Sequence, residues 1–275
     1  MPYISVIMGV YNCENMVALK DTVDSIINQK FEDWEFIICN DGSTDNTLDN
    51  LKKIEKLDNR IKIISYKENR GLGSALNSCI NVSKGKYIAR QDDYDISKPD
   101  RFSKQIKFLE ENPDISIVGT IADVFNDKLE WGSYFVPERP SKNDFLWNSP
   151  FLHPSIIMKK DDLVCAGGYR ISIETRLCED FDLFMRMYSL GMKGYNIQEK
   201  LYKYRIDIGA QKYRPMRVRI EEAKVRYKGY KILGLLPRGI IYVFKPIVIG
   251  LIPWIAFKRI RKKQYLNDIE KSNIY

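Results

Sequence analysis

Three aspartates, Asp92, Asp93 and Asp95, fall within four residues directly after an apolar segment. Like charges this close repel one another unless a cation neutralises them or one carboxylate is protonated. Carboxylate oxygens are the ligands that Mg²⁺ and Mn²⁺ prefer, particularly where a phosphate completes the coordination. The cluster therefore predicts a divalent cation beside a phosphate-bearing ligand. The alternative is a solvated acidic turn that also caps a helix near Pro99.

Two further polar groups follow apolar segments earlier in the chain. Residues 10–12 (Val-Tyr-Asn) end one such segment, and residues 40–45 end the next. The alternative for the second group is a turn and helix cap, with Ser43 or Thr44 as the capping residue. If the apolar segments are parallel strands, ligands bind beyond their carboxyl ends. All three polar groups would then meet at one edge of a sheet.

The elements that must position these groups alternate between strands and helices. We expect strands at residues 4–10, 34–39, 61–65, 86–90 and 115–125, with helices at 16–29, after residue 44, at 72–82 and at 99–110. This alternation predicts an α/β fold with a Rossmann-like, mostly parallel sheet and helices on both of its faces. Residues 131–195 are less regular and read as an α+β continuation of the same domain.

Several other polar residues have simple structural explanations. Glu179, Asp180 and Asp182 would favour the start of a helix through its dipole. His153 is the only histidine, which excludes multi-histidine metal sites, and a lone histidine is more often a hydrogen-bonding residue than a ligand. Residues 71–73 (Gly-Leu-Gly) begin like a dinucleotide fingerprint but lack its third glycine, so they are a weak signal for hydride transfer.

Composition divides the chain into an acidic body and a basic tail. The 275 residues carry a net charge of +8, yet residues 201–263 alone hold 17 basic and 3 acidic residues. With 44% hydrophobic residues the chain is too apolar to be disordered. Five cysteines without a Cys-x-x-Cys pair are expected to be reduced, mostly buried thiols of a cytosolic protein. The first residues lack a signal-peptide pattern, so secretion is not expected.

The basic tail also contains an apolar stretch. Residues 214–231 are rich in Lys and Arg, and residues 240–257 are apolar except for Lys245 but interrupted by Pro246, Gly250 and Pro253. Nucleic-acid binding is one interpretation. A basic flank on a proline-broken apolar segment favours instead a peripheral or monotopic contact with the anionic cytoplasmic face of the cell membrane. The alternative is a helical pair packed on the α/β domain or in a dimer.

Taken in order, the motifs resemble family 2 glycosyltransferases of the GT-A fold over about residues 3–205. The similarity rests on seven segments: residues 5–12 (SVIMGVYN), 40–47 (NDGSTDNT), 69–77 (NRGLGSALN), 85–101 (GKYIARQDDYDISKPDR), 153–155 (HPS), 167–169 (GGY) and 179–183 (EDFDL). The resemblance implies a GT-A domain over residues 1–205, with a nucleotide-binding half to about 130 and an acceptor half over 131–205. Residues 206–275 would form the membrane-associating helical tail.

The resemblance also implies the donor site. A UDP-sugar would be held by Val10, Tyr11, Asn12, Asp41, Arg70, Asp92 and Asp93. Mn²⁺ or Mg²⁺ would bind at Asp93, with Asp95 as the alternative ligand and His153 as a possible third one. Family members commonly carry a second acidic residue where this chain has Tyr94, and a neutral phenol is a poor ligand for a hard cation.

By the same resemblance, Asp180 would be the catalytic base, with Glu179 supporting it or contacting the acceptor. The implied function is an inverting, metal-dependent glycosyltransferase that moves a sugar to a hydroxyl of a lipid-linked or saccharide acceptor in surface polysaccharide synthesis. The alternatives are a nucleotidyltransferase and a catalytically weak, membrane-bound nucleotide-sugar binder, the latter because of Tyr94. No nucleic-acid partner is expected, and the oligomeric state is open.

Overall fold

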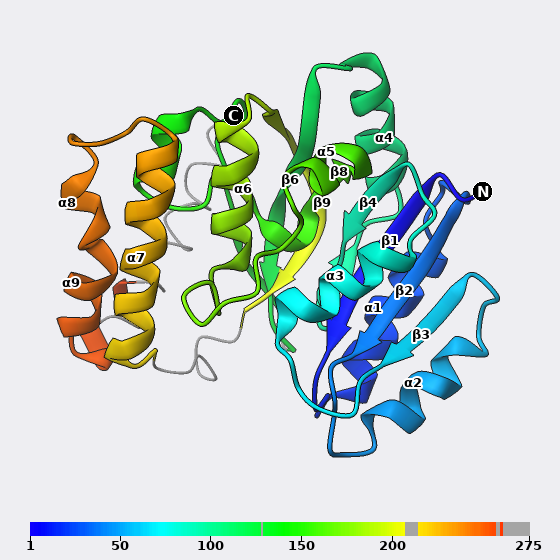
Figure 1. Ribbon diagram of the computed structural model, residues 1–275. Coiled ribbons are helices and arrows are strands. Elements are labelled where there is room, and N and C mark those ends of the chain that lie inside the picture. The colour runs from blue at the N-terminus through cyan, green and yellow to red at the C-terminus, as the bar shows by residue number, and fades with distance from the viewer. Residues whose placement is uncertain (128, 207–213, 257–258, 261–275) are drawn as a thin grey trace.

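The computed structural model describes residues 1–127, 129–206, 214–256 and 259–260 (Figure 1). Strands and helices alternate from the N-terminus: β1 (Ile4–Val10), α1 (Met16–Ile27), β2 (Trp34–Asn40), α2 (Thr47–Glu55), β3 (Ile61–Ser65), α3 (Leu72–Val82), β4 (Tyr87–Arg90), β5 (Ile96–Ser97), α4 (Arg101–Glu111) and β6 (Ile115–Phe125). The second half contains β7 (Glu130–Tyr134), β8 (Ile157–Lys159), α5 (Lys160–Cys165), α6 (Glu179–Ser189), β9 (Lys193–Arg205), α7 (Met216–Ile232), α8 (Ile240–Val243) and α9 (Lys245–Leu251).

One sheet runs through the described residues in the order β3-β2-β1-β4-β8-β6-β9-β5, with β7 beside β6. The first four strands are parallel, and β6 pairs in parallel with β9. β8 lies antiparallel between β4 and β6 and so joins the two halves. Because Val10 is in register with Asn40, the loops after β1 and β2 leave the sheet side by side. The prediction of a mostly parallel α/β sheet is confirmed.

Alternating side chains of the central strands enter two separate cores. Ile7, Ile37 and Ile88 pack with residues of α3 and α6 on one face of the sheet. Val6 and Phe36 pack with α1, α2 and α4 on the other face. Near-continuous apolar strands are what a sheet covered on both sides requires, and Figure 1 shows helices on both faces.

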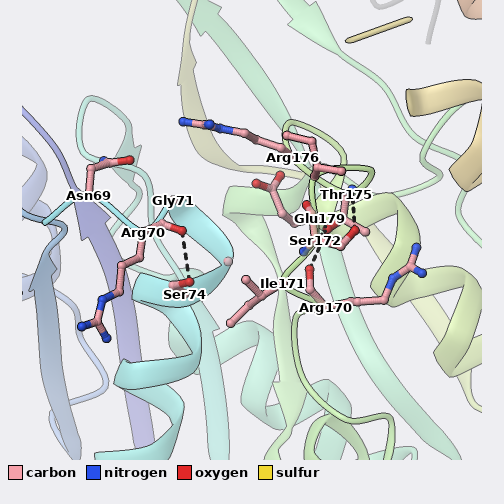
Figure 2. Close-up of a pocket in the computed structure, with 12 residues that line it drawn as sticks. Asn69, Arg70, Gly71, Ser74, Arg170, Ile171, Ser172, Thr175, Arg176 and Glu179 are labelled. Atoms are coloured by element: carbon pink, nitrogen blue, oxygen red, sulfur yellow. Dashed lines mark hydrogen bonds between the residues drawn. The ribbon is translucent and has the colours of Figure 1, made fainter. Parts of the chain in front are cut away.

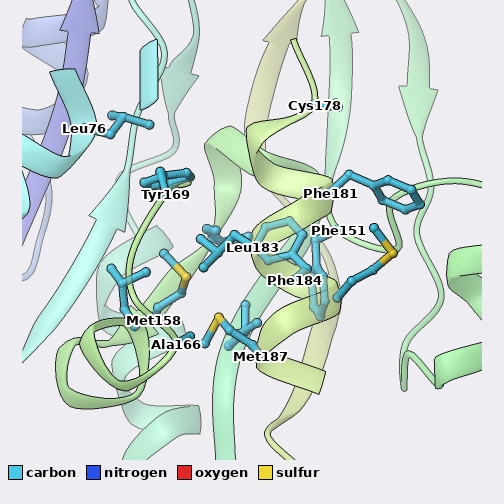
Figure 3. Packing of buried hydrophobic residues seen from close by; sticks show 14 of the residues in the cluster. Leu76, Phe151, Met158, Ala166, Tyr169, Cys178, Phe181, Leu183, Phe184 and Met187 are labelled. Atoms are coloured by element: carbon cyan, nitrogen blue, oxygen red, sulfur yellow. The ribbon is translucent and has the colours of Figure 1, made fainter. Parts of the chain in front are cut away.

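The core on the α3 side extends under the C-terminal helices. Figure 3 shows part of this cluster, in which Phe181, Leu183 and Phe184 of α6 pack beside Phe151. α7 adds Ala223, Val225 and Tyr230 to the same cluster. A Cβ at Gly229 of α7 would overlap the sulfur of Met185, so this glycine permits the close approach of the two helices. The alternative of helices packed on the α/β domain is thus confirmed for α7.

Several details differ from the sequence-based expectations. α2 begins at Thr47 after Asn46, so neither Ser43 nor Thr44 caps it. The short strand β5 was not expected. Four cysteines are buried as expected, but Cys165 is exposed. No helix among the described residues is both long and apolar enough to cross a membrane. Most of the basic run 258–263 lies outside the described residues.

Candidate active site at the carboxyl ends of the parallel strands

The loops after β1 and β2 are tied to each other by side-chain hydrogen bonds. The backbone N–H of Asn12 donates to Oγ of Ser43 at 3.0 Å, and the N–H of Thr44 donates to Oδ1 of Asn12 at 2.9 Å. Asn12 adopts a positive φ of 45°, a conformation that asparagine tolerates better than most residues. Ser43 and Thr44 therefore bond to the loop after β1, at the junction of the β1 and β2 loops, and do not cap α2. Tyr11 lies beside this junction, half exposed to solvent.

Asp41 organises the turn that leads into α3. Its buried carboxylate accepts hydrogen bonds from the backbone N–H groups of Arg70 and Gly71, each at 2.8 Å, and from Nδ2 of Asn69 at 3.0 Å. A carboxylate has about four acceptor positions, so these three bonds do not use all of them. The next residue, Gly42, has a φ of 69°, and a Cβ there would collide with the backbone of Glu68.

The acidic turn after β4 places its three aspartates in different environments. Asp92 is partly exposed and pairs with the buried guanidinium of Arg90. Burial, assisted by the neighbouring charge of Asp92, raises the pKa of Asp93 to about 7. Asp95 is buried; its carboxylate accepts hydrogen bonds from the Tyr202 hydroxyl at 3.1 Å and the Arg205 N–H at 2.7 Å. Asp95 thus joins the turn to β9, and Asp93 is the more accessible candidate ligand.

Tyr94, between these aspartates, turns away from them. Its ring packs against the core on the α1 side, and its hydroxyl donates to the Cys13 sulfur at 3.5 Å. Its carbonyl oxygen accepts a hydrogen bond from Nε of Arg205 at 2.9 Å. The side chain that replaces an acidic residue therefore has a packing role in this chain.

Arg101, at the start of α4, donates hydrogen bonds to residues that flank the acidic turn after β4. All five of its N–H donors are used: on Oε1 of Gln105, on Oε1 of Gln91, on Oγ of Ser97, and on the carbonyl oxygens of Arg90 and Ile156. The side chain is fully buried, and burial lowers the pKa of its guanidinium to about 10. The sequence analysis included Arg101 in a motif but missed this role, which only the fold reveals.

Two carboxylates begin α6. Burial raises the pKa of Asp180 to about 6, and the charge of Glu179 acts in the same direction. Burial also raises the pKa of Glu179. Asp182, by contrast, forms ion pairs with Arg170 at 2.7 Å and Arg186 at 2.8 Å. Because Asp182 is committed to these cations, Glu179 and Asp180 are the carboxylates available for proton transfer.

His153 lies in a short 3-10 turn (His153–Ser155), and its Nε2 is 2.8 Å from the Tyr169 hydroxyl. Burial and the nearby Arg90 charge hold the pKa of His153 well below its usual value, so the ring is neutral. Tyr169 is held in turn by Asn77, whose side chain donates to its carbonyl oxygen at 2.7 Å and accepts from its N–H at 2.9 Å. The expected hydrogen-bonding role of His153 is therefore present.

The residues expected to hold a metal do not form a closed cage. Among residues 1–127, 129–206, 214–256 and 259–260, no three His, Cys, Asp or Glu side chains converge as a ligand group. Asp93, Asp95 and His153 as a set are thus not brought together, because Asp95 faces β9 and His153 faces Tyr169. The adjacent Asp92 and Asp93 still fit Mg²⁺ or Mn²⁺, which proteins often hold by one or two carboxylates with substrate phosphates as further ligands.

A pocket of about 260 Å³ separates the two halves of the site (Figure 2). One wall is the turn into α3, including Arg70 and Gly73, and the other is the loop before α6. Glu179 lies on the second wall, and its Cγ would be 3.5 Å from a Cβ at Gly73. The loop residues of that wall were not singled out from the sequence; the Gly-Gly-Tyr segment just before them was the available signal.

Comparison with known proteins gives one family. The model of "Glycosyl transferase family 2" matches residues 5–167. EpsE of Bacillus subtilis (strain 168), a protein assigned to the glycosyltransferases, is 38% identical over 98% of this chain and 96% of its own length. An Escherichia coli enzyme, UDP-Gal:alpha-D-GlcNAc-diphosphoundecaprenol beta-1,3-galactosyltransferase, is 28% identical over 92% of each chain.

A solved structure confirms the fold. TarS residues 1–349 of S. aureus, in complex with UDP-GlcNAc, superposes with a TM-score of 0.69 at 17% identity. The match covers 91% of this chain and 76% of TarS 1–349. At this identity the likeness establishes the shared architecture of sheet and helices.

Proposed function

The chain belongs to glycosyl transferase family 2, and from this premise we propose that it is an inverting glycosyltransferase that uses a UDP-sugar. The acceptor would be a hydroxyl of a lipid-linked or saccharide intermediate in surface polysaccharide synthesis. The observation that carries the proposal is the pair Glu179 and Asp180 at the first turn of α6, whose pKa values are raised and of which Glu179 lines the pocket opposite the α3 turn. Family membership favours glycosyl transfer over the nucleotidyl transfer considered from the sequence.

Asp180 would act as the general base. Its carboxylate takes the proton of the acceptor hydroxyl while the acceptor oxygen attacks the anomeric carbon from the face opposite the diphosphate. The bond between that carbon and the diphosphate oxygen breaks, and UDP leaves with the electron pair, so the configuration inverts. A divalent cation at Asp93 would stabilise the charge on the departing diphosphate. Glu179, on the pocket wall, would orient the acceptor.

The donor assignment rests on the polar edge formed by β1, β2 and β4. One acceptor position of Asp41 remains for the N–H of a base. Arg70 stacks its guanidinium on Tyr66, 4.7 Å from the ring centroid, beside this edge. The similar E. coli enzyme acts on UDP-Gal, and TarS, which shares the fold, binds UDP-GlcNAc. The partner proposed for this chain is accordingly a UDP-sugar.

Calorimetric titration of UDP tests the donor site. In the presence of Mn²⁺ we expect binding that excess EDTA weakens at least tenfold, because the diphosphate and Asp93 share the cation. Asp93→Ala should lose this metal dependence, whereas Asp95→Asn should mainly lower thermal stability because Asp95 bonds to β9. UDP binding that is equally tight with Mn²⁺ and EDTA would remove the cation from the proposal. Absence of UDP binding under every condition would refute the donor assignment.

Substitution of Tyr94 tests whether the acidic turn is degenerate. Tyr94→Phe should keep metal-dependent UDP binding within about threefold, because the ring packing survives. Tyr94→Asp should weaken UDP binding at least tenfold, since it removes that packing and adds a charge beside Asp93, which is already difficult to ionise. The same titration measures both variants. A gain in affinity for Tyr94→Asp would instead support the degenerate-site alternative.

We also propose that α8 and α9 place the enzyme on an anionic membrane. Large apolar side chains are exposed in these helices, between them and just beyond them: Ile241, Phe244, Val248, Leu251 and Ile255 are all more than half exposed. Lys245 does not interrupt this surface, because it turns inward over the Trp147 ring, 3.7 Å from the centroid, and donates to Asn148. An apolar face flanked by basic residues is typical of helices that lie in a membrane interface.

Vesicle co-sedimentation checks the membrane proposal. The protein should sediment with vesicles that contain anionic phospholipid. Val248→Asp combined with Leu251→Asp should lower its affinity for these vesicles at least tenfold. Val17→Asp combined with Leu57→Asp, two exposed apolar residues outside the tail and the pocket, is the matched control and should bind vesicles as the unchanged protein does. Equal sedimentation of all three proteins would show that this surface does not contact the bilayer.

A further inference from the structure

A fully buried arginine lies directly before the acidic turn. Arg90 ends β4, its side chain has no exposed surface, and its Nη2 donates to Oδ1 of Asp92, whose side chain is 37% exposed. Within the described part of the chain, its other two donor nitrogens, Nε and Nη1, are buried without a hydrogen-bond partner. A guanidinium in this position is tolerated only when an opposite charge compensates it.

The neutral groups around Arg90 do not provide that compensation. Burial raises the pKa of the nearby Tyr169 and Tyr202 hydroxyls, so neither is ionised, and the buried ring of His153 is neutral as well. Of the residues that the structure describes, Asp92 is the carboxylate that forms an ion pair with Arg90. Arg90 therefore depends on Asp92 for charge compensation.

This pairing leaves the acidic turn with little free negative charge. Asp95 is taken up by the hydrogen bond from the Tyr202 hydroxyl. Asp93 forms no ion pair with a described residue. Arg90, Asp92 and Asp93 together carry a single net negative charge when both aspartates are ionised, which does not neutralise a divalent cation. The diphosphate of a nucleotide would supply the negative charge that is missing.

We infer that Arg90 is an internal counter-ion that makes the divalent cation bind together with the nucleotide. Because Arg90 neutralises Asp92, the turn holds Mn²⁺ or Mg²⁺ only weakly until a diphosphate is present. Arg90 is thus a positioning residue, since it acts on the cation through Asp92. The inference rests on the cation proposed at Asp93, and it deepens the proposed function by assigning what controls the occupancy of that site.

Mn²⁺ binding to the full chain without nucleotide tests the inference, measured from the electron paramagnetic resonance signal of free Mn²⁺. Arg90→Met should bind Mn²⁺ at least tenfold more tightly than the unchanged protein, because it removes a positive charge and releases Asp92. Arg90→Lys keeps the charge and should stay within about threefold of the unchanged protein. Arg60→Met is the matched control. Arg60 also pairs with an aspartate two positions away, Asp58 at 2.7 Å, but lies just before β3, so Mn²⁺ binding should not change.

A charge-matched double variant shows whether Asp92 is the partner of Arg90 or itself a metal ligand. In the presence of UDP, Asp92→Asn should weaken Mn²⁺ binding at least tenfold, because it leaves Arg90 unpaired. Arg90→Met combined with Asp92→Asn restores the net charge, so it should recover Mn²⁺ binding to within about threefold of the unchanged protein. A double variant that binds Mn²⁺ as weakly as Asp92→Asn would show that Asp92 is a ligand and would overturn the inference.

Two other results separate this inference from the proposed function. Equal Mn²⁺ affinity of Arg90→Met and the unchanged protein, with UDP binding that still requires Mn²⁺, would refute the counter-ion alone. Absence of metal-dependent UDP binding in the unchanged protein would refute the proposed cation at the donor site as well. Thermal unfolding shows whether each variant is folded. If Arg90→Met is not, the double variant decides on its own, because it buries no unpaired charge.

Discussion

Asp180→Asn is expected to reduce kcat for sugar transfer by roughly 10²- to 10⁴-fold, the contribution typical of a general base. Asparagine keeps the size of the side chain but accepts no proton. UDP affinity should stay within about threefold, because Asp180 lies at the start of α6 and not at the nucleotide edge. Steady-state transfer from a UDP-sugar, measured beside UDP calorimetry, separates the two effects. Activity of the variant within tenfold of the unchanged enzyme would contradict the role.

The pH dependence of kcat follows from the raised pKa of Asp180. A base works in its deprotonated form, so activity should be constant at higher pH and fall as pH decreases through about 6. At saturating donor and Mn²⁺, the fall should approach tenfold per pH unit. Asp180→Asn should lose this limb. Glu179→Gln removes the neighbouring charge that disfavours ionisation, so it should move the limb to lower pH.

Arg101→Met is expected to give the largest loss of stability, about 3–5 kcal/mol in the free energy of unfolding, because several buried acceptors lose their donor at about 1–3 kcal/mol each. The substitution leaves the carbonyl oxygens of Arg90 and Ile156 without their donor in a dry environment. Thermal unfolding should shift by roughly 10 °C for a chain of this size. Arg101→Lys keeps three donors, so its unfolding temperature should lie between those of the unchanged protein and Arg101→Met.

The control for Arg101 is an exposed cation with a single partner. Lys20 pairs with Asp24 on the surface of α1, with 60% of its side chain exposed. Such pairs contribute little, so Lys20→Met should change stability by less than about 1 kcal/mol. If Arg101→Met unfolds at the same temperature as Lys20→Met, the network beneath the acidic turn is not essential. The same samples, titrated with UDP, show whether the turn after β4 also loses its shape.

The sequence was sufficient for elements whose cause is local. β1, β3, α3 and β6 have the bounds expected from their apolar patterns. In β1 and β6 the apolar run is itself the reason that the strand is buried in the sheet. The cap of α2 was mispredicted because Ser43 bonds to Asn12 across the β1–β2 junction. That competition is a tertiary contact, and no local pattern contains it.

The same distinction applies to the candidate site. Asp93 and Asp95 are equivalent in the sequence, and only the position of β9 shows that Asp95 is enclosed by Tyr202 and Arg205. Likewise, Arg70 and Arg170 have the same chemistry, and their partners alone distinguish them. Sequence motifs therefore pointed to this edge of the sheet and to the residues proposed for its chemistry. Only the fold shows which of these aspartates and arginines remain available to a ligand.

The packing of α7 against α6 has a geometric consequence. α6 carries the proposed base at its first turn, α7 covers its back at the Gly229 contact, and α9 packs on α7. If α8 and α9 lie on a bilayer as proposed, the three stacked helices set a fixed distance between the proposed base and the lipid headgroups. The enzyme would then select acceptors by how far their hydroxyl stands from the membrane. Removing residues 206–275 would abolish this fixed distance and would also expose the side of α6 that α7 covers.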